Sequence, residues 1–295
     1  MILRKESGVM AVCLKRPMLR QRIITALWLL PLALLCILVP ARGAYYPIWL
    51  GVQALVLALF VWGGVEWTHL MRFKPLTSRL FVVGLGMTLS LLAVFFNKIP
   101  PLLVWAVALL WWSIALYAVL RYQQTPFRRF GGTASAIGTG ACLLVPPYFS
   151  FLYLKTVTPG HNWLLYAVLV VWCADTGAYF VGKKFGQRKL ADRISPGKTR
   201  EGLMGALVSV WVMAALIYLC QGFKGFSFVQ WMIWMTVIAL ASVLGDLLES
   251  LFKRMQGVKD SGTALPGHGG ILDRIDSLTA ALPIAAMTQW IMLSK

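Results

Sequence analysis

Apolar stretches long enough to cross a lipid bilayer recur along almost the whole chain. A membrane-spanning helix needs about 20 consecutive, mostly apolar residues. Stretches of this kind lie at 23–41, 46–65, 80–97, 99–120, 134–154, 162–181, 203–221, 228–251 and 277–293. The sequence therefore predicts an all-α, polytopic membrane protein with about nine transmembrane helices, the third and fourth being joined by a very short turn.

The composition agrees with a lipid environment. Only 13% of the 295 residues are charged and 59% are hydrophobic, whereas soluble domains have about 25% charged residues. The formal net charge of +18 would suggest nucleic acid as a partner of a soluble protein. In a membrane protein, basic residues gather in cytoplasmic loops, where they set the orientation and meet anionic headgroups. We therefore expect a multi-pass protein of the cell inner (cytoplasmic) membrane that does not bind nucleic acid.

The basic residues are distributed very unevenly between the two sides of the predicted bundle. If the N-terminus is cytoplasmic, 23 of the 28 Lys and Arg residues fall in cytoplasmic segments and five fall outside. This asymmetry predicts a cytoplasmic N-terminus and a C-terminus on the outside. Residues 1–17 are predicted to form a basic N-terminal arm, and Met18 is an alternative start.

The acidic residues divide the rest of the chain into two regions. Eight of the ten acids lie between residues 175 and 276. We therefore predict an N-terminal transmembrane scaffold at 18–160 and a C-terminal transmembrane catalytic region at 161–295. The five cysteines include no C-x-x-C pair and the three histidines are scattered, so neither disulfides nor a zinc site are expected.

One polar stripe lies at the predicted cytoplasmic end of the eighth helix. Asp246, Glu249, Ser250 and Lys253 are spaced at i, i+3, i+4 and i+7, which places them on one helix face. An ionised group in apolar surroundings costs several kcal/mol unless it is paired or bound to a metal. The stripe is therefore a candidate active site, and a salt-bridged packing face is the alternative.

Two more acids stand at the start of the last predicted helix. Asp273 and Asp276 fall in its first turn, where the helix dipole tolerates acids, so they could simply be caps. Facing Asp246 across a glycine-rich turn, they would instead form an oxygen-rich site of the kind that Mg²⁺ prefers. We therefore predict Mg²⁺ as the cofactor, with ligands from Asp246, Asp273, Asp276 and Glu249.

The segment between these two helices is rich in glycine. It contains Lys259, His268, Gly269 and Gly270. Glycines allow backbone N–H groups to approach an anion closely. A flexible cytoplasmic turn would have a similar composition, so the glycines indicate a phosphate site only together with the lysine and the facing acids.

A second polar segment follows the sixth apolar stretch. Asp175 lies within that stretch, and an acid inside a membrane span is a functional candidate. Ser195, Lys198 and Thr199 follow in the sequence SPGKT. The spacing of a nucleotide-binding P-loop is not met, since Asp192 occupies the first glycine position, and no strand is expected before it. Lys198 can still bind phosphate as a point charge.

The run 250–276 resembles the signature of the phosphatidate cytidylyltransferases, also called CDP-diacylglycerol synthases, over all its 27 positions. The segments around Asp175 and at 195–199 are similar to other recurring stretches of that family. The resemblance implies a helical membrane enzyme, a homodimer, that makes CDP-diacylglycerol from CTP and phosphatidic acid. It also implies Mg²⁺, with K⁺ as a second ion.

The resemblance implies the following roles. The catalytic residues are Asp246, Asp273, Lys253 and Lys259. The substrate-binding residues are Asp175, Ser195, Lys198, Thr199, Arg254, His268, Gly269, Gly270 and Arg274.

Two other functions are alternatives for a membrane protein with acids in its spans. The CDP-alcohol phosphotransferases share a D-G-x-x-A-R run that this chain lacks, since Asp175 is followed by Thr176. A transporter of an anionic solute would suit acids inside the membrane. The lack of internal repeats and the charge concentrated at one predicted membrane edge favour the enzyme.

Overall fold

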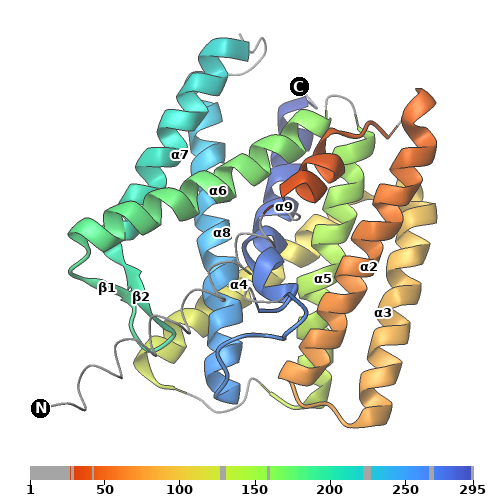
Figure 1. The fold of residues 1–295 in the computed structure, drawn as a ribbon, viewed down its shortest axis with the longest axis horizontal. Helices are drawn as coiled ribbons and strands as arrows, with labels where there is room; N and C mark the ends of the chain where they lie inside the picture. Colours follow the sequence, from red (N-terminus) through yellow and green to blue (C-terminus); the bar gives the residue numbers. More distant parts are fainter. Residues whose placement is uncertain are drawn as a thin grey trace, which may run out of the picture.

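The fold was analysed in a computed structural model that describes residues 27, 30–41, 43–126, 131–157, 160–221, 227–265 and 269–293. Residues 30–38 are helical. The elements that follow are η1 (Gly43–Tyr45), α2 (Tyr46–Leu70), α3 (Pro75–Phe95), η2 (Phe96–Lys98), α4 (Pro101–Gln124), α5 (Thr133–Thr156), α6 (Gly160–Phe185), β1 (Lys189–Ala191), β2 (Ser195–Thr199), α7 (Arg200–Gln221), α8 (Phe228–Gln256) and α9 (Leu272–Leu293) (Figure 1).

Among the described residues, seven helices, α2 to α8, are long and apolar enough to cross a membrane. The prediction of an all-α polytopic membrane protein is therefore confirmed in its main feature. The predicted span 277–293 lies within α9, which is not among these seven. The predicted span 23–41 is described only in part, and residues 1–17 and Met18 lie outside the described residues. The count of nine spans and the orientation stay predictions.

Prolines begin three of these helices. Pro47, Pro75 and Pro101 occupy the first turns of α2, α3 and α4. Proline suits this place because the first-turn N–H groups have no partner within the helix. The short turn expected between the third and fourth spans is present as η2 and two further residues.

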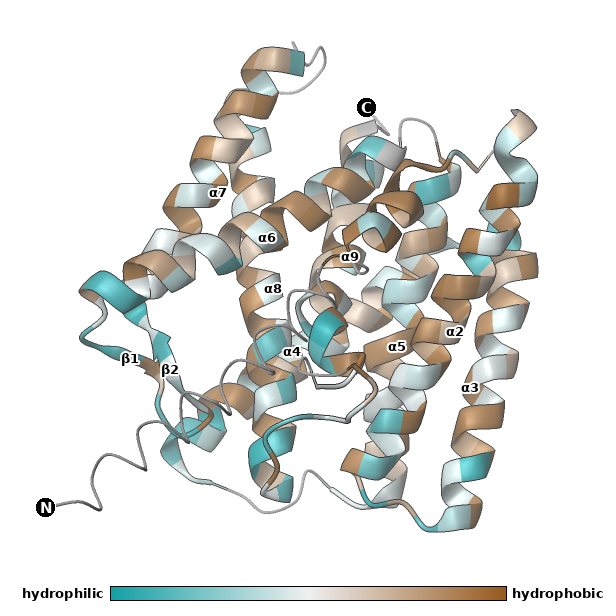
Figure 2. Cartoon of the chain, in the orientation of Figure 1, coloured by the Kyte–Doolittle hydropathy of each residue, from teal (hydrophilic) through white to brown (hydrophobic). Residues whose placement is uncertain are grey.

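The helices form a bundle with α5 near its centre. In the most apolar stretch of α5, 67% of residues are buried, against 22% in α3 and α7. Apolar residues continue onto the outer faces of α3 and α7 (Figure 2), where Leu80, Val94 and Leu219 are exposed. This outward apolar surface is what a lipid-facing helix requires. α5 packs against both α6 and α9, so the two predicted regions share one core, and the boundary between them stays a prediction.

The segment between α6 and α7 contains a small antiparallel hairpin instead of a loop. Lys189 pairs with Thr199, and Ala191 pairs with Ser195. The expectation that no strand precedes the Gly-Lys-Thr sequence is thus wrong, because β1 precedes it and the sequence itself forms β2. Pairing of the strands satisfies backbone groups in a segment whose Pro196 disfavours a helix. A P-loop stays excluded, because Gly197 lies in a strand and not in a loop.

Arginines tie the chain segments together at the hairpin side of the bundle. Arg193 donates to Gln124 O at the end of α4, at 2.8 Å, and Arg72 donates to Gln256 O at the end of α8, at 3.2 Å. The α2–α3 turn, the hairpin and the end of α8 therefore lie on the same side of the molecule, opposite the end of α9 (Figure 1).

Candidate active site

The hairpin places a lysine against the polar stripe of α8. Lys198 Nζ lies 2.5 Å from Asp246 Oδ2, and about a quarter of each side chain is exposed. Ser250 Oγ donates to the other oxygen of Asp246 at 3.3 Å. A predicted phosphate-binding cation and a predicted metal ligand are thus in direct contact, in the C-terminal half of the candidate membrane-spanning helix α8.

The C-terminal part of the same stripe, from Glu249 to Lys253, belongs to a buried group of charges. Lys253 Nζ donates to Asp273 Oδ1 at 2.7 Å and lies 3.4 Å from Glu249 Oε1. The side chains of all three residues are at most 10% exposed. The predicted stripe is therefore present, and it binds α9 through Asp273.

Asp273 also organises the loop that precedes it. Its carboxylate accepts hydrogen bonds from Gly270 N at 2.7 Å and from Ser261 N at 3.0 Å. Burial alone would raise the pKa of Asp273, but the hydrogen bonds from Lys253 and Gly270 outweigh it and hold the pKa below its usual value. Gly269 has a φ of +83°, a backbone conformation that favours glycine. Asp273 is therefore kept ionised by donors from two segments.

Asp276 is the acid of α9 whose carboxylate interacts electrostatically with Asp246. Helices α8 and α9 touch here, because a Cβ atom at Gly245 would lie only 2.5 Å from Asp276 O. Burial first, and then the negative charge of Asp246, raise the pKa of Asp276 to about 6. The structure thus places Asp276 against α8, within electrostatic range of Asp246 and with Glu249 as its side-chain partner, while Asp273 is engaged by Lys253.

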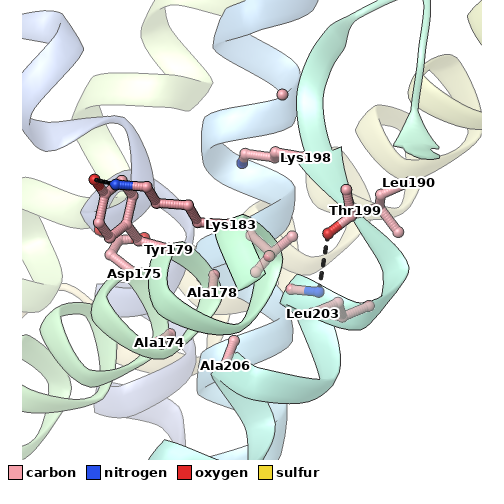
Figure 3. Close-up of a pocket in the computed structure, with 14 residues that line it drawn as sticks. Ala174, Asp175, Ala178, Tyr179, Lys183, Leu190, Lys198, Thr199, Leu203 and Ala206 are labelled. Carbon is pink, nitrogen blue, oxygen red and sulfur yellow. Dashed lines mark hydrogen bonds between the residues drawn. The ribbon is translucent and has the colours of Figure 1, made fainter. Parts of the chain in front are cut away.

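A pocket of about 290 Å³ lies between α6, the hairpin and α7. Its polar lining comes from Asp175, Tyr179, Lys183, Lys198 and Thr199 (Figure 3). Lys183 Nζ lies 3.4 Å from the hydroxyl of Tyr179. The pocket thus offers two lysines, which suits an anionic ligand such as a phosphate.

Two of the predicted substrate-binding residues have structural partners. Thr199 Oγ1 accepts a hydrogen bond from Gly202 N at 3.0 Å and so caps α7. Arg254 Nε donates to Ile194 O at 3.1 Å and thereby docks the hairpin turn on α8. Both residues hold the hairpin in place beside the pocket.

The remaining predicted site residues lie on three different segments. Ser195 is partly buried at the start of β2, Lys259 is exposed in the loop after α8, and Arg274 is exposed in the first turn of α9. Arg274 is within electrostatic range of Asp175. His268 lies outside the described residues.

The sequence patterns did not single out Glu66, which is buried near the C-terminal end of α2. Its carboxylate accepts a hydrogen bond from Ser261 Oγ at 3.2 Å and from the backbone N–H groups of Ile271 and Leu272. A weaker signal was available, because Glu66 directly follows the predicted span 46–65, whereas Asp175 lies within its span.

The acids of the site fit a hard cation. Both carboxylate oxygens of Glu249 are buried and accept no hydrogen bond within the described part of the chain. Carboxylate oxygens, completed by phosphates and water, are the ligands that Mg²⁺ prefers. Among the described residues, no three His, Cys, Asp or Glu side chains are grouped as a ready-made metal site. A cation here would therefore depend on phosphate or water oxygens for several of its ligands.

Zinc and disulfides find no support in the described segments. Cys36, Cys142, Cys173 and Cys220 are free thiols, and Cys13 lies outside the described residues. Thiol pairing is thus absent from the part of the chain that the structure describes, and the expectation of neither disulfides nor a zinc site stays a prediction.

Comparison with known proteins identifies the family. Residues 20–292 match the cytidylyltransferase family. The phosphatidate cytidylyltransferase of Pseudomonas aeruginosa is 41% identical over 92% of this chain and 97% of its own length. The Haemophilus influenzae enzyme of the same name is 38% identical over 90% and 96%, and that of Staphylococcus aureus is 43% identical over 57% and 64%. The chain therefore belongs to the cytidylyltransferase family and is a nucleotidyltransferase.

Proposed function

We propose that this protein is a phosphatidate cytidylyltransferase, which makes CDP-diacylglycerol and pyrophosphate from CTP and phosphatidic acid. The names of its near-full-length relatives and the match to their family support this function. The structural observation that supports it best is the contact between Lys198 and Asp246. It joins β2, which carries the predicted phosphate-binding lysine, to an acid in the C-terminal half of a candidate membrane-spanning helix, where a lipid phosphate and a water-soluble nucleotide would meet.

The reaction needs no dedicated general base. A phosphate oxygen of phosphatidic acid forms a bond to the α-phosphorus of CTP. The bond from that phosphorus to the bridging oxygen breaks, and pyrophosphate leaves with the electron pair. A phosphate monoester is largely dianionic near pH 7, with a second pKa of about 6, so the attacking oxygen is already deprotonated.

The lysines of the pocket are proposed to bind the phosphates of CTP. Lys183 and Lys198 line the same cavity, and each can neutralise phosphate oxygens as a point charge. Asp246 holds Lys198 in place through their ion pair. The charge that develops on the leaving pyrophosphate is thus met by groups that are already in place.

Mg²⁺ is proposed as the cofactor, with K⁺ as a second ion. Asp246, Asp276 and Glu249 would hold Mg²⁺ together with phosphate or water oxygens, because Asp246 contacts Lys198 and Asp276 interacts with both Asp246 and Glu249. When bound, Mg²⁺ supplies positive charge that stabilises the transferring phosphate. Asp273 stays a predicted ligand, although its contacts with Lys253 and the loop favour an organising role.

The proposed orientation places this site at the cytoplasmic face of the inner membrane. A homodimer is also proposed, on the family resemblance. Cross-linking of the purified protein followed by mass measurement tests the dimer.

A purified-protein assay tests the function. The protein in detergent micelles is given CTP, Mg²⁺ and phosphatidic acid, and both pyrophosphate and CDP-diacylglycerol are measured. We expect equal amounts of both products, and neither when phosphatidic acid is omitted. Consumption of CDP-diacylglycerol would favour a phosphotransferase, and solute uptake into liposomes without pyrophosphate release would favour a transporter.

A further inference from the structure

The carboxylate of Glu66 lies at the point where the loop after α8 turns into α9. The residue is only 3% exposed. It accepts hydrogen bonds from Ser261 Oγ at 3.2 Å, Ile271 N at 3.0 Å and Leu272 N at 2.8 Å. The first N–H groups of a helix lack partners within the helix and carry partial positive charge. Glu66 therefore caps α9 from a helix some 200 residues earlier in the chain.

The loop is shaped to fit around this carboxylate. A Cβ atom at Gly262 would lie 2.7 Å from Glu66 Oε1, and one at Gly270 would overlap both Glu66 Oε2 and Ser261 Oγ. Two glycines of the loop thus pack directly on Glu66, where any larger residue would push the loop away.

Glu66 and Asp273 hold adjacent groups of the same loop. Ser261 donates its hydroxyl to Glu66 and its backbone N–H to Asp273. Gly270 N donates to Asp273, and the next N–H, of Ile271, donates to Glu66. Because Asp273 also binds Lys253, a shift of the loop would disturb the buried charges of α8.

We infer that Glu66 is a positioning residue for nucleotidyl transfer, which orients the first turn of α9 and its two acids toward α8. This inference rests on the proposed function. The alternative is a cap that stabilises the fold and leaves catalysis unaffected.

The first test measures the loop directly and needs no activity. In the full-length protein in detergent, Glu66→Gln preserves the shape of the side chain and removes its charge. We expect amide hydrogen exchange in peptides covering 269–275 to rise at least about tenfold, since a hydrogen bond to a charged group is worth about a decade or more in an equilibrium constant. Unchanged exchange in a folded Glu66→Gln protein would overturn the inference.

A matched control removes another buried charge at a distance from the site. Lys155 is 5% exposed and donates to Ile37 O and Val39 O, at 2.9 and 2.6 Å. Lys155→Met should lower thermal stability and leave exchange at 269–275 and turnover per folded protein unchanged. If Glu66→Gln does not fold, Ser261→Ala removes one of the three bonds and should raise the same exchange by a smaller factor; no rise would overturn the inference.

The second test separates positioning from stability. For Glu66→Gln we expect kcat per folded protein to fall by about 10- to 100-fold, as is usual for residues that orient ligating side chains. The KM for CTP should change much less, because the proposed CTP-binding residues Lys183 and Lys198 line the pocket beside α6, which Glu66 does not line. Glu66→Asp should recover part of kcat. Faster exchange with unchanged kcat would show that Glu66 is only a cap. If the wild-type protein makes no CDP-diacylglycerol, the proposed function fails, and the exchange test still shows whether Glu66 holds the loop.

Discussion

The carboxylates of the candidate site differ in how many hydrogen-bond donors contact them. Asp273 accepts from Lys253 and from two backbone N–H groups, and Asp246 is paired with Lys198. Glu249 has an ion pair with Lys253 at 3.4 Å and interacts with the carboxylate of Asp276. A carboxylate with few donors is better placed to bind a cation than one whose oxygens are already engaged. Both oxygens of Asp246 are engaged, by Lys198 and by Ser250 Oγ, so by this criterion Glu249 is a stronger candidate for the metal than Asp273.

We predict that Asp246→Asn lowers turnover by about 100-fold at any Mg²⁺ concentration, because it removes both a proposed ligand and the partner of Lys198. Initial rates of CDP-diacylglycerol formation across a Mg²⁺ titration measure this. Asp192→Asn, at an exposed position of the hairpin turn, serves as the control and should leave the titration unchanged. Full activity and an unaltered Mg²⁺ dependence of Asp246→Asn would exclude a metal role.

A second prediction concerns Lys253, the cation shared by two buried acids. Lys253→Met should lower the free energy of unfolding by about 3–5 kcal/mol, because Glu249 and Asp273 would lose their counter-charge. Unfolding by SDS in mixed micelles measures the change. Lys259→Met, at an exposed position, should change stability by less than about 0.5 kcal/mol. Equal stabilities of the two variants would contradict the buried charge group.

At the scale of elements, the hairpin is held to the bundle by arginines. Arg254 of α8 donates to Ile194 O, and Arg193 donates to Gln124 O. These contacts place β2, and with it Lys198, against α8. Arg254 was predicted to bind substrate, and its observed partners are the backbone carbonyls of Ile194 and Val258, so it can act on the substrate through the hairpin.

We therefore expect Arg254→Leu to loosen the hairpin. Trypsin should cleave the full-length protein after Arg188 and Lys189 about tenfold faster, because loss of a charged hydrogen bond favours local opening. The KM for CTP should rise, since Lys198 would leave the pocket. Arg79→Leu, at an exposed position of α3, is the control; cleavage as slow as in the control would count against docking by Arg254.

Contact between α8 and α9 provides another prediction. Gly245→Ala should destabilise the protein by about 1–3 kcal/mol, because the new methyl group would meet the backbone of Asp276. Gly51→Ala is a matched control within α2, where a Cβ atom has no neighbour within 4 Å. It should be neutral, or stabilising by up to about 1 kcal/mol. Thermal unfolding in detergent compares the two, and equal effects would argue against close packing at Gly245.

For the whole molecule, the functional side is the side on which α2 and α8 end and the hairpin lies (Figure 1). The excess of basic residues predicts that this side is cytoplasmic. The outer faces of α3 and α7 are apolar, as lipid contact requires. The site would then stand at the membrane edge, with access to a lipid from the bilayer and to a nucleotide from water.

Labelling of cysteines in intact cells tests this orientation. Cys220 is replaced by Ser because it is exposed, and a single cysteine is introduced at Lys74 or at Asn97, both exposed positions at opposite ends of α3. A membrane-impermeant maleimide should label Asn97→Cys and leave Lys74→Cys unlabelled until the cells are opened. The reverse pattern would invert the predicted topology.

Local pattern was enough to predict most of the helices and the polar face of α8. In lipid, backbone groups must bond within their own segment, so a long apolar run becomes a helix whatever its neighbours are. For the same reason the spacing of Asp246, Glu249, Ser250 and Lys253 correctly placed them on one face of α8. The family signature at 250–276 correctly indicated a cytidylyltransferase.

Tertiary structure alone decided which of these residues meet. The hairpin between α6 and α7, the pairing of Lys253 with Asp273, and the approach of Asp276 to Asp246 all depend on how helices pack. Glu66 and Leu272 are 206 positions apart, and neither local hydropathy nor helical periodicity relates two such residues. Their contact exists because α2, α8 and α9 pack together, and that packing follows from side chains spread over the whole chain.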